Sequence, residues 1–164
     1  MAKYFVMAVV LAGVLYLVFR DKDPVAASAE GAIHAPLDKV WKIQTDIAGW
    51  KNWNQDIESM EVGDNVGLGS EFTWKAGGIT IESKITEFVP NKRIAWKGKT
   101  FGIDAYHIWE FTESESGVKV HTEEKFTGPL AWLLPGTMRD QISKALNHGI
   151  KVLKLEAEKK PARS

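Results

Sequence analysis

Residues 71–126 alternate between apolar and polar side chains, and this pattern constrains the fold more than any other feature of the sequence. Five segments show the alternation, and turns rich in Gly, Pro and Asn separate them. Successive side chains of a strand point to opposite faces, so each segment predicts a strand with one apolar face. The short turns predict an antiparallel meander. The segments are EFTWKA, GGITIESKITEFVP, RIAWKG, DAYHIWEF and VKVHTEEKF.

The apolar face of such a sheet needs a cover, and one segment of the chain is long enough to provide it. Residues 138–160 have their apolar side chains at the spacing of an amphipathic helix. Upstream, residues 23–36 predict a short linker that runs into a sixth strand, and residues 36–62 predict two short helices. We therefore expect an α+β fold. A curved antiparallel sheet of about six strands is wrapped around a long C-terminal helix, with a cavity between them.

The stretch Tyr4–Phe19 contains no charged residue and predicts a transmembrane helix before the sheet. Its length of about sixteen residues corresponds to about 24 Å of helix, against a hydrocarbon core of about 30 Å. Lys3 and Arg20 flank the stretch and would extend its reach toward the lipid head groups. A cleaved signal peptide is the alternative, but the charged sequence RDKDPVA separates the candidate cleavage site ASAE from the apolar run.

These features divide the chain into three parts. Residues 1–22 are predicted to be a membrane anchor or a signal peptide, residues 23–160 a ligand-binding domain, and residues 161–164 a polar tail. The predicted localisation is a membrane, with a single-pass N-terminal anchor. A secreted or periplasmic protein is the alternative if the segment is cleaved. The sequence does not indicate the side of the membrane, because the basic residues at the two ends of the apolar run nearly balance.

Composition argues against several classes of function. The net charge is zero, whereas a nucleic-acid partner requires clustered excess Lys and Arg. The absence of cysteine excludes a thiol nucleophile and a zinc–thiolate site. Neither a nucleophile elbow nor a dinucleotide-binding loop is present, so we expect no cofactor. We also expect no metal, because the histidines lack ligand spacing; they are His34, His107, His121 and His148.

His107 is the most informative polar residue, because it shares one strand face with Trp109 and Phe111. In the next strand, Thr122 and Glu124 share a face with apolar residues. If both faces point inward, these polar side chains form a cluster on an apolar wall. The cluster is then either a polar contact for a ligand or a general base tuned by Glu124. The alternative is a buried pair that holds the sheet register, and no residue is assigned as catalytic beyond the candidates His107 and Glu124.

Aromatic and aliphatic side chains at strand spacing are the second indication of a site. One interpretation is that they line an apolar pocket for a small hydrophobic ligand. The other is that they fill the interior themselves and leave little room. The candidate ligand-binding residues are Phe72, Trp74, Ile81, Ile85, Trp96, His107, Trp109, Thr122 and Glu124.

The order of elements resembles the helix-grip fold of the START-related and pollen-allergen-like superfamily (SRPBCC), and within it the polyketide cyclase/dehydrase-like family. The resemblance implies a helix-grip fold over most of the chain and an interior that binds a ligand. It implies no single catalytic motif, because members include lipid and sterol carriers, hormone receptors, co-chaperones and aromatase/cyclases. The stretches that carry it are residues 35–57, 69–75, 85–98, 107–111 and 122–128.

The function we predict from the sequence is membrane-anchored binding or transport of a small hydrophobic, lipid-like ligand in an internal cavity. The expected partners are this ligand and the membrane, reached through Tyr4–Phe19. A cyclase- or dehydratase-type enzyme acting on a bound hydrophobic substrate is one alternative. A protein-interaction module with a filled interior is another.

Overall fold

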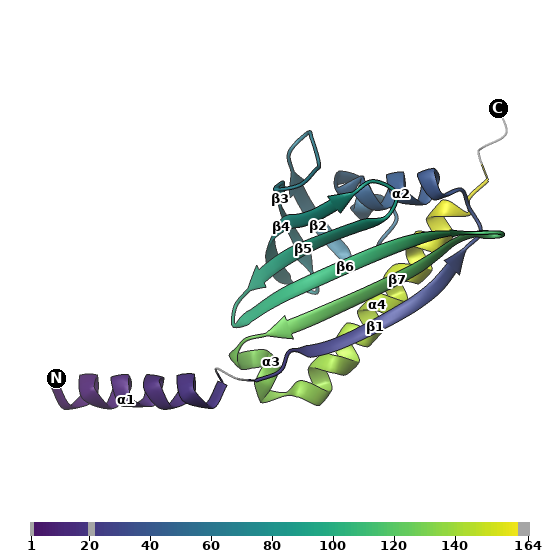
Figure 1. Ribbon diagram of the computed structural model, residues 1–164. Coiled ribbons are helices and arrows are strands. Elements are labelled where there is room, and N and C mark those ends of the chain that lie inside the picture. The colour runs from purple at the N-terminus through teal and green to yellow at the C-terminus, as the bar shows by residue number, and fades with distance from the viewer. Residues whose placement is uncertain (1, 20–21, 161–164) are drawn as a thin grey trace.

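The computed structural model describes residues 2–19 and 22–160, so the predicted tail, residues 161–164, lies outside the described residues. A helix, a strand and two short helical segments come first, six further strands follow, and the chain ends in two helices (Figure 1). The elements are α1 (Ala2–Phe19), β1 (Val25–Ile33), α2 (Leu37–Thr45), η1 (Ile47–Asn52), β2 (Ile57–Val62), β3 (Glu71–Ala76), β4 (Ile79–Val89), β5 (Arg93–Thr100), β6 (Ile103–Ser114), β7 (Gly117–Thr127), α3 (Pro129–Leu133) and α4 (Pro135–Ala157).

The seven strands form one antiparallel sheet in the order β1-β7-β6-β5-β4-β3-β2. The predicted meander of five strands is present as β3 to β7, and β1 closes back onto β7. The sequence prediction missed β2, because residues 49–62 were assigned to a turn and a second short helix. Only Ile47–Asn52 is helical, and Ile57–Val62 instead pairs with β3 through an irregular register.

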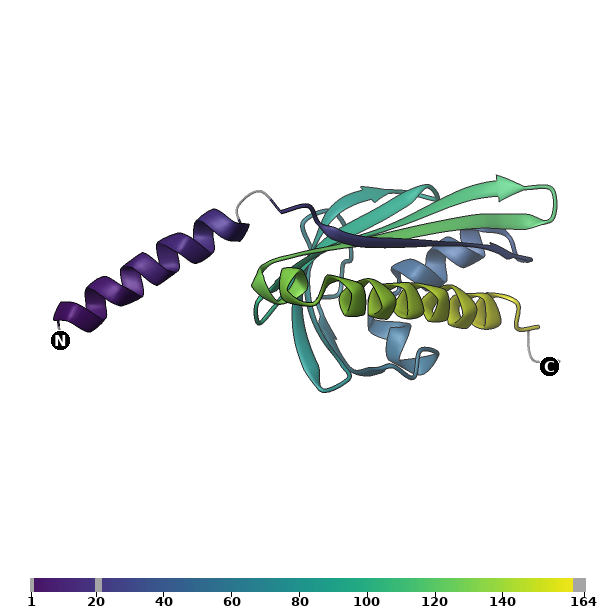
Figure 2. The same ribbon diagram turned by 90° about the horizontal axis from the view of Figure 1, so that it is seen from below.

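The long helix α4 lies against the inner face of the sheet beneath β1 and β7 (Figures 1 and 2). Ile142, Leu146 and Leu153 are buried on its sheet-facing side. The helix approaches β1 closely at Gly31, where a β-carbon would lie only 2.6 Å from Ile150 Cγ2. This arrangement of a curved sheet around a C-terminal helix is the expected helix-grip fold.

The other half of the inner face is covered by α2 and η1 rather than by α4. Trp50 of η1 meets Phe72 and Trp96 edge-on or tilted, with ring centroids 5.9 and 5.5 Å apart. Trp41 of α2 packs in the same way on Phe88 and Phe111. Many of the aromatic side chains therefore fill the interior themselves in this half of the molecule.

The predicted transmembrane helix is wrong. Helix α1 stands away from the sheet in both ribbon views (Figures 1 and 2), but within residues 2–19 and 22–160 no helix has the length and apolarity that a membrane span requires. As a helix, the apolar run is about 6 Å shorter than the thickness of the hydrocarbon core. The sequence prediction relied on the flanking charged residues to make up this difference in length. The predicted localisation, a single-pass membrane anchor, is overturned by the same finding.

Candidate functional site

Three polar side chains meet on the inner face where β6 and β7 pair. The register sets His107 opposite Glu124 and Trp109 opposite Thr122, so side chains from neighbouring pairs lie side by side. His107 Nε2 is 3.0 Å from Thr122 Oγ1, and His107 Nδ1 is 3.5 Å from Glu124 Oε1. These three residues are called the inner trio below.

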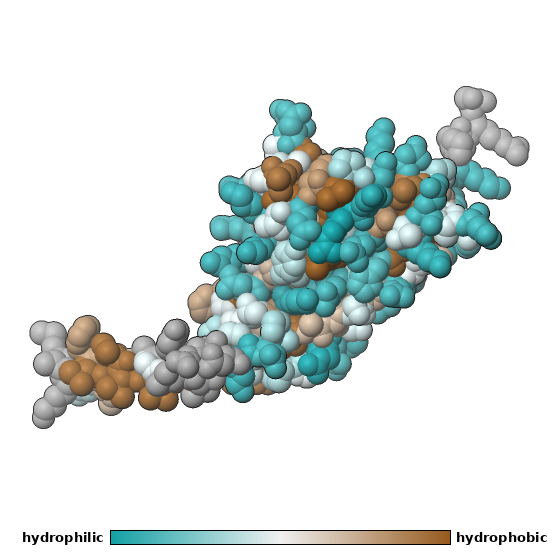
Figure 3. All heavy atoms as spheres, viewed as in Figure 1, coloured by the Kyte–Doolittle hydropathy of each residue, from teal (hydrophilic) through white to brown (hydrophobic). Residues whose placement is uncertain are grey.

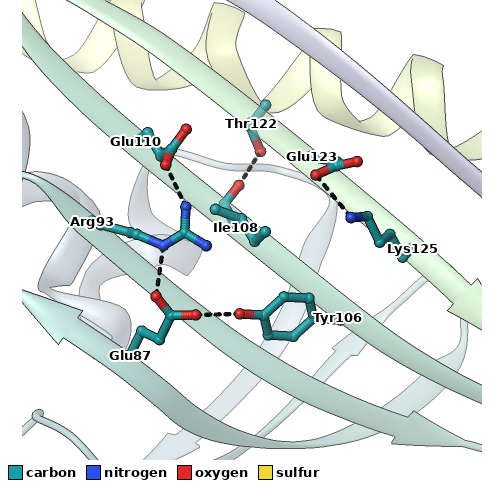
Figure 4. A network of polar contacts seen from close by, with 8 residues as sticks. All are labelled: Glu87, Arg93, Tyr106, Ile108, Glu110, Thr122, Glu123 and Lys125. Carbon is teal, nitrogen blue, oxygen red and sulfur yellow. Dashed lines mark hydrogen bonds and ion pairs between the residues drawn. The ribbon is translucent and has the colours of Figure 1, made fainter.

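Thr122 determines which nitrogen of His107 carries the proton. Its hydroxyl donates to the carbonyl oxygen of Ile108 at 2.8 Å, as Figure 4 shows, so its single proton is used. The hydroxyl oxygen is then left to accept from His107 Nε2. The neutral imidazole therefore carries its proton on Nε2, and Nδ1 presents a lone pair to Glu124.

Burial disfavours charge on both members of the pair. The side chains of His107 and Glu124 are 13% and 14% exposed, while Thr122 is fully buried. Loss of hydration lowers the pKa of His107 to about 3 and raises the pKa of Glu124 to about 7. Near neutral pH, His107 is neutral and Glu124 can gain or lose a proton, which is the property of a general acid or base.

The nine candidate residues fall into two groups by exposure. Phe72, Ile85, Trp96, Trp109 and Thr122 are buried and packed into the core. Partial exposure is found at the other four, which are Trp74, Ile81, His107 and Glu124. The buried members form the wall of the site: the Trp96 and Trp109 rings lie 4.6 and 5.8 Å from the His107 ring, centroid to centroid.

Small side chains occupy the inner positions beside His107. Ser83, Gly98 and Ala105 follow one another across β4, β5 and β6. They separate Trp74 and Ile81 from the inner trio, and Ser83 accepts a hydrogen bond from Trp74 Nε1 at 3.1 Å. Ala105 is partly exposed, whereas Ser83 and Gly98 are buried, so the strip reaches solvent at its Ala105 end. Sequence analysis did not single out the strip, although its small residues are visible at alternating positions.

Two open hollows of about 1100 and 1000 Å³ lie at the surface, and neither is lined by His107 or Glu124. The first touches the small strip, but most of its lining consists of outward-facing side chains such as Lys97, Tyr106 and Lys125. Its walls carry both signs of charge, since Glu71 and Lys84 form an ion pair there at 2.9 Å. The described residues also contain no group of three His, Asp or Glu side chains that could hold a metal ion.

The outer face carries a polar network that sequence analysis did not find (Figure 4). Arg93 donates to Glu87 at 2.6 Å and also to Glu110, and Tyr106 donates to Glu87. Arg93, and secondarily Tyr106, hold the pKa of Glu87 below its usual value. The outward-facing Ala95 is nevertheless fully buried, so the network acts as a polar cover for the outer surface of β5 and β6. In Figure 3 this face is largely hydrophilic, with scattered apolar spheres.

Comparison with known protein families identifies the family to which this sheet-and-helix domain belongs. The family model described as polyketide cyclase / dehydrase and lipid transport matches residues 24–158. The chain belongs to this family. The match spans the sheet, α2, η1, α3 and α4, and it confirms the resemblance on which the helix-grip prediction was based. Among curated proteins, none matches the chain.

Solved structures share the fold of this family member at low sequence identity. A hypothetical protein from Helicobacter pylori is 17% identical, with a TM-score of 0.73, over 81% of this chain and 88% of its own. A START superfamily protein from Mycobacterium smegmatis is 14% identical, with a TM-score of 0.68, over 84% of this chain and 98% of its own. The di-domain ARO/CYC BexL of the BE-7585A biosynthetic pathway is 19% identical, with a TM-score of 0.70; the match covers 83% of this chain and half of BexL.

Proposed function

We propose that residues 23–160 bind a small, largely apolar molecule on the inner face of the sheet, with its polar end at the inner trio. One observation carries the proposal. His107 and Glu124 are polar, mostly buried and still open to solvent, on a wall otherwise built of Trp96, Trp109 and other apolar side chains. Buried polar groups of this kind need partners, and an apolar wall with few polar groups is typical of ligand sites.

The small strip gives the apolar body of such a ligand a place to lie. Gly98 and Ala105 present little or no side chain beside the inner trio, and Trp74 and Ile81 border the strip on its far side. A flat or narrow molecule in this position would cover the exposed parts of Trp74 and Ile81 and reach His107 with one end. The family's description, which includes lipid transport, agrees with an apolar ligand.

A space-filling substitution tests this placement. Ala105→Phe places a ring on the strip, so it is expected to abolish binding of the neutral fluorescent probe N-phenyl-1-naphthylamine and retention of apolar compounds detected by mass spectrometry. Thr112→Phe is the matched control, because Thr112 lies on the same strand, faces outward and is exposed. Probe binding that is equal in the wild type and in Ala105→Phe would refute the placement, as would a wild type that takes up nothing.

A second function is a cyclase- or dehydratase-type activity on the same ligand. The observation that favours it is Glu124, whose pKa of about 7 places a proton-transferring carboxyl beside the lone pair of His107 Nδ1. The recovered compound distinguishes the two functions. A carrier returns a supplied compound unchanged, whereas an enzyme of this class returns it rearranged or with one water lost.

A further inference from the structure

The pair His107 and Glu124 presents hydrogen-bond acceptors to each other. Because Thr122 fixes the His107 proton on Nε2, Nδ1 has only a lone pair to offer. The ionised Glu124 carboxylate likewise accepts and cannot donate. Their separation of 3.5 Å exceeds an ordinary N–H···O or O–H···N distance. With Glu124 ionised, the pair therefore lacks a donor, and a group that supplies one proton satisfies either acceptor.

Within the described residues, the strand positions beside this pair on the inner face carry no cation. By register, the inner positions next to His107 and Glu124 are apolar or small on every neighbouring strand; they are Trp96 and Gly98 on β5, Ala105 and Trp109 on β6, Thr122 and Phe126 on β7, and Ala27 and Ala29 on β1. Two basic side chains of α4, Arg139 and Lys154, are directed instead to the carbonyl oxygens of Ala26 and Ala32. A ligand carboxylate at the inner trio would meet Glu124 with nothing to offset the repulsion.

Trp109 adds a donor that has no partner. Its indole Nε1 is buried and makes no hydrogen bond within the described part of the chain. Trp109 is the next inward residue after His107 on β6, and the two rings lie 5.8 Å apart. A buried indole N–H without an acceptor costs free energy. The neighbourhood of the inner trio therefore contains two unsatisfied acceptors and one unsatisfied donor.

We propose that the ligand bound at the inner trio is an apolar molecule bearing a hydroxyl group, and that the site rejects the corresponding carboxylate. This inference rests on the proposed function and names the chemical class of the ligand. An alcohol or phenol hydroxyl donates one hydrogen bond, which Glu124 or His107 Nδ1 accepts. A carboxylate has no proton to donate, and an ether accepts but does not donate.

Three aromatic probes of nearly equal size separate these chemistries. Calorimetric titration of the full chain compares 2-naphthol, 2-methoxynaphthalene and 2-naphthoate at about pH 8, where Glu124, with a pKa of about 7, is mostly ionised. The dissociation constant of 2-naphthol is expected to be at least about tenfold lower than that of the methyl ether, a difference of about 1.4 kcal/mol. The dissociation constant of 2-naphthoate is expected to be higher than that of 2-naphthol by about a hundredfold or more.

The variant Glu124→Gln tests the missing donor directly. The amide has the shape of the carboxylate but can donate to His107 Nδ1, so the pair no longer needs a donor from the ligand. The preference for 2-naphthol over its methyl ether should then fall to about threefold or less. Glu123→Gln is the matched control, because Glu123 is the preceding residue and points to the outer face, where it pairs with Lys125. It should keep the wild-type preference.

The outcomes separate this inference from the proposed function. If 2-naphthoate or the methyl ether binds as tightly as 2-naphthol, the inference is wrong while apolar binding stands. The inference is also wrong if Glu124→Gln keeps the full preference. If none of the three probes binds in a manner that Ala105→Phe abolishes, the proposed function fails and the inference fails with it.

Discussion

Glu124 is the residue whose chemistry depends most on where the fold places it. Its neighbour Glu123 points to the opposite face and pairs with Lys125, whereas Glu124 faces His107 on the inner face with 14% of its side chain exposed. Burial raises the pKa of Glu124 from the usual 4.5 to about 7. Two adjacent carboxyl groups of one strand thus differ in role because strand geometry sends them to opposite sides.

This shift predicts how stability depends on pH. The folded pKa of about 7 lies above the unfolded value of 4.5, so Glu124 contributes stability that is complete below the unfolded pKa and is lost as the pH rises through the folded pKa. The loss amounts to about 3 kcal/mol. In Glu124→Gln this contribution is absent, so the wild type should lose stability relative to the variant between about pH 4 and about pH 8. Urea unfolding across this range measures the difference.

His107 titrates in both the wild type and Glu124→Gln, so its opposing effect on the free energy of unfolding largely cancels when the two proteins are compared. Its folded pKa of about 3 lies below the unfolded value of 6.5, so its contribution is lost as the pH falls. Glu123→Gln serves again as the outward-facing control. A stability difference between the wild type and Glu124→Gln that does not change with pH would contradict the raised pKa.

At the residue scale, the sequence predicted part of the candidate site. Alternation was enough to put His107 and Trp109 on one face, because that relation is local to one strand. The contact between His107 and Glu124 depends on the register between β6 and β7, and the exposure of each side chain depends on how α4, α2 and η1 divide the inner face. Neither property is local to one strand. The sequence therefore could not predict that Phe72 is buried while Trp74 is partly exposed to solvent.

Among the elements, β1 and α4 approach each other closely at Gly31, and glycine permits it. A side chain at Gly31 would place its β-carbon 2.6 Å from Ile150 Cγ2, a methyl group fixed to the branched Cβ of a buried side chain. The strand therefore needs to shift, or the helix needs to move away, for any larger residue to be accommodated.

We expect Gly31→Ala to reduce the free energy of unfolding by about 1–3 kcal/mol through overpacking. Gly136→Ala is the matched control, because Gly136 lies in α4 with open space around it. That change should be neutral or should stabilise the protein by up to about 1 kcal/mol through helix propensity. Chemical denaturation of both variants provides the test, and an unchanged midpoint for Gly31→Ala would show that β1 and α4 can separate without cost.

The elements themselves were predictable where they were regular and long. The strands β3 to β7 and the helix α4 follow from periodicity, since each repeats its pattern several times. The strand β2 has six residues, IESMEV, and its alternation is too short to stand out from a helical turn. Its conformation is decided by pairing with β3, and such pairing is not visible in the segment alone.

On the scale of the whole molecule, the N-terminal helix and the sheet domain are separate. The ribbon views place α1 away from the sheet, and its described side chains from Tyr4 to Val14 are largely exposed. The carbonyl of Asp23, between α1 and β1, is already tied to the domain, because it accepts a hydrogen bond from Trp132 Nε1 at 3.0 Å.

Removal of residues 1–22 should therefore leave the domain folded. The fragment that begins at Asp23 is expected to unfold at the same denaturant midpoint as the full chain, with a free energy of unfolding within about 0.5 kcal/mol. Tryptophan fluorescence reports on this transition because the core contains Trp50, Trp96 and Trp109. A large loss of stability in the fragment would mean that the boundary between the two parts lies elsewhere.

The two edge strands of the sheet, β1 and β2, are protected in different ways against pairing with a strand of another molecule. An edge strand normally offers free backbone groups that another chain can use to extend the sheet. On β1, Arg139 and Lys154 of α4 already bind the carbonyl oxygens of Ala26 and Ala32, 3.4 and 2.8 Å away. On β2, the length is only six residues and the charged Glu58 pairs with Lys75. Both edges therefore resist strand-by-strand aggregation, β1 because side chains of α4 occupy two of its carbonyl oxygens and β2 because it is short and charged.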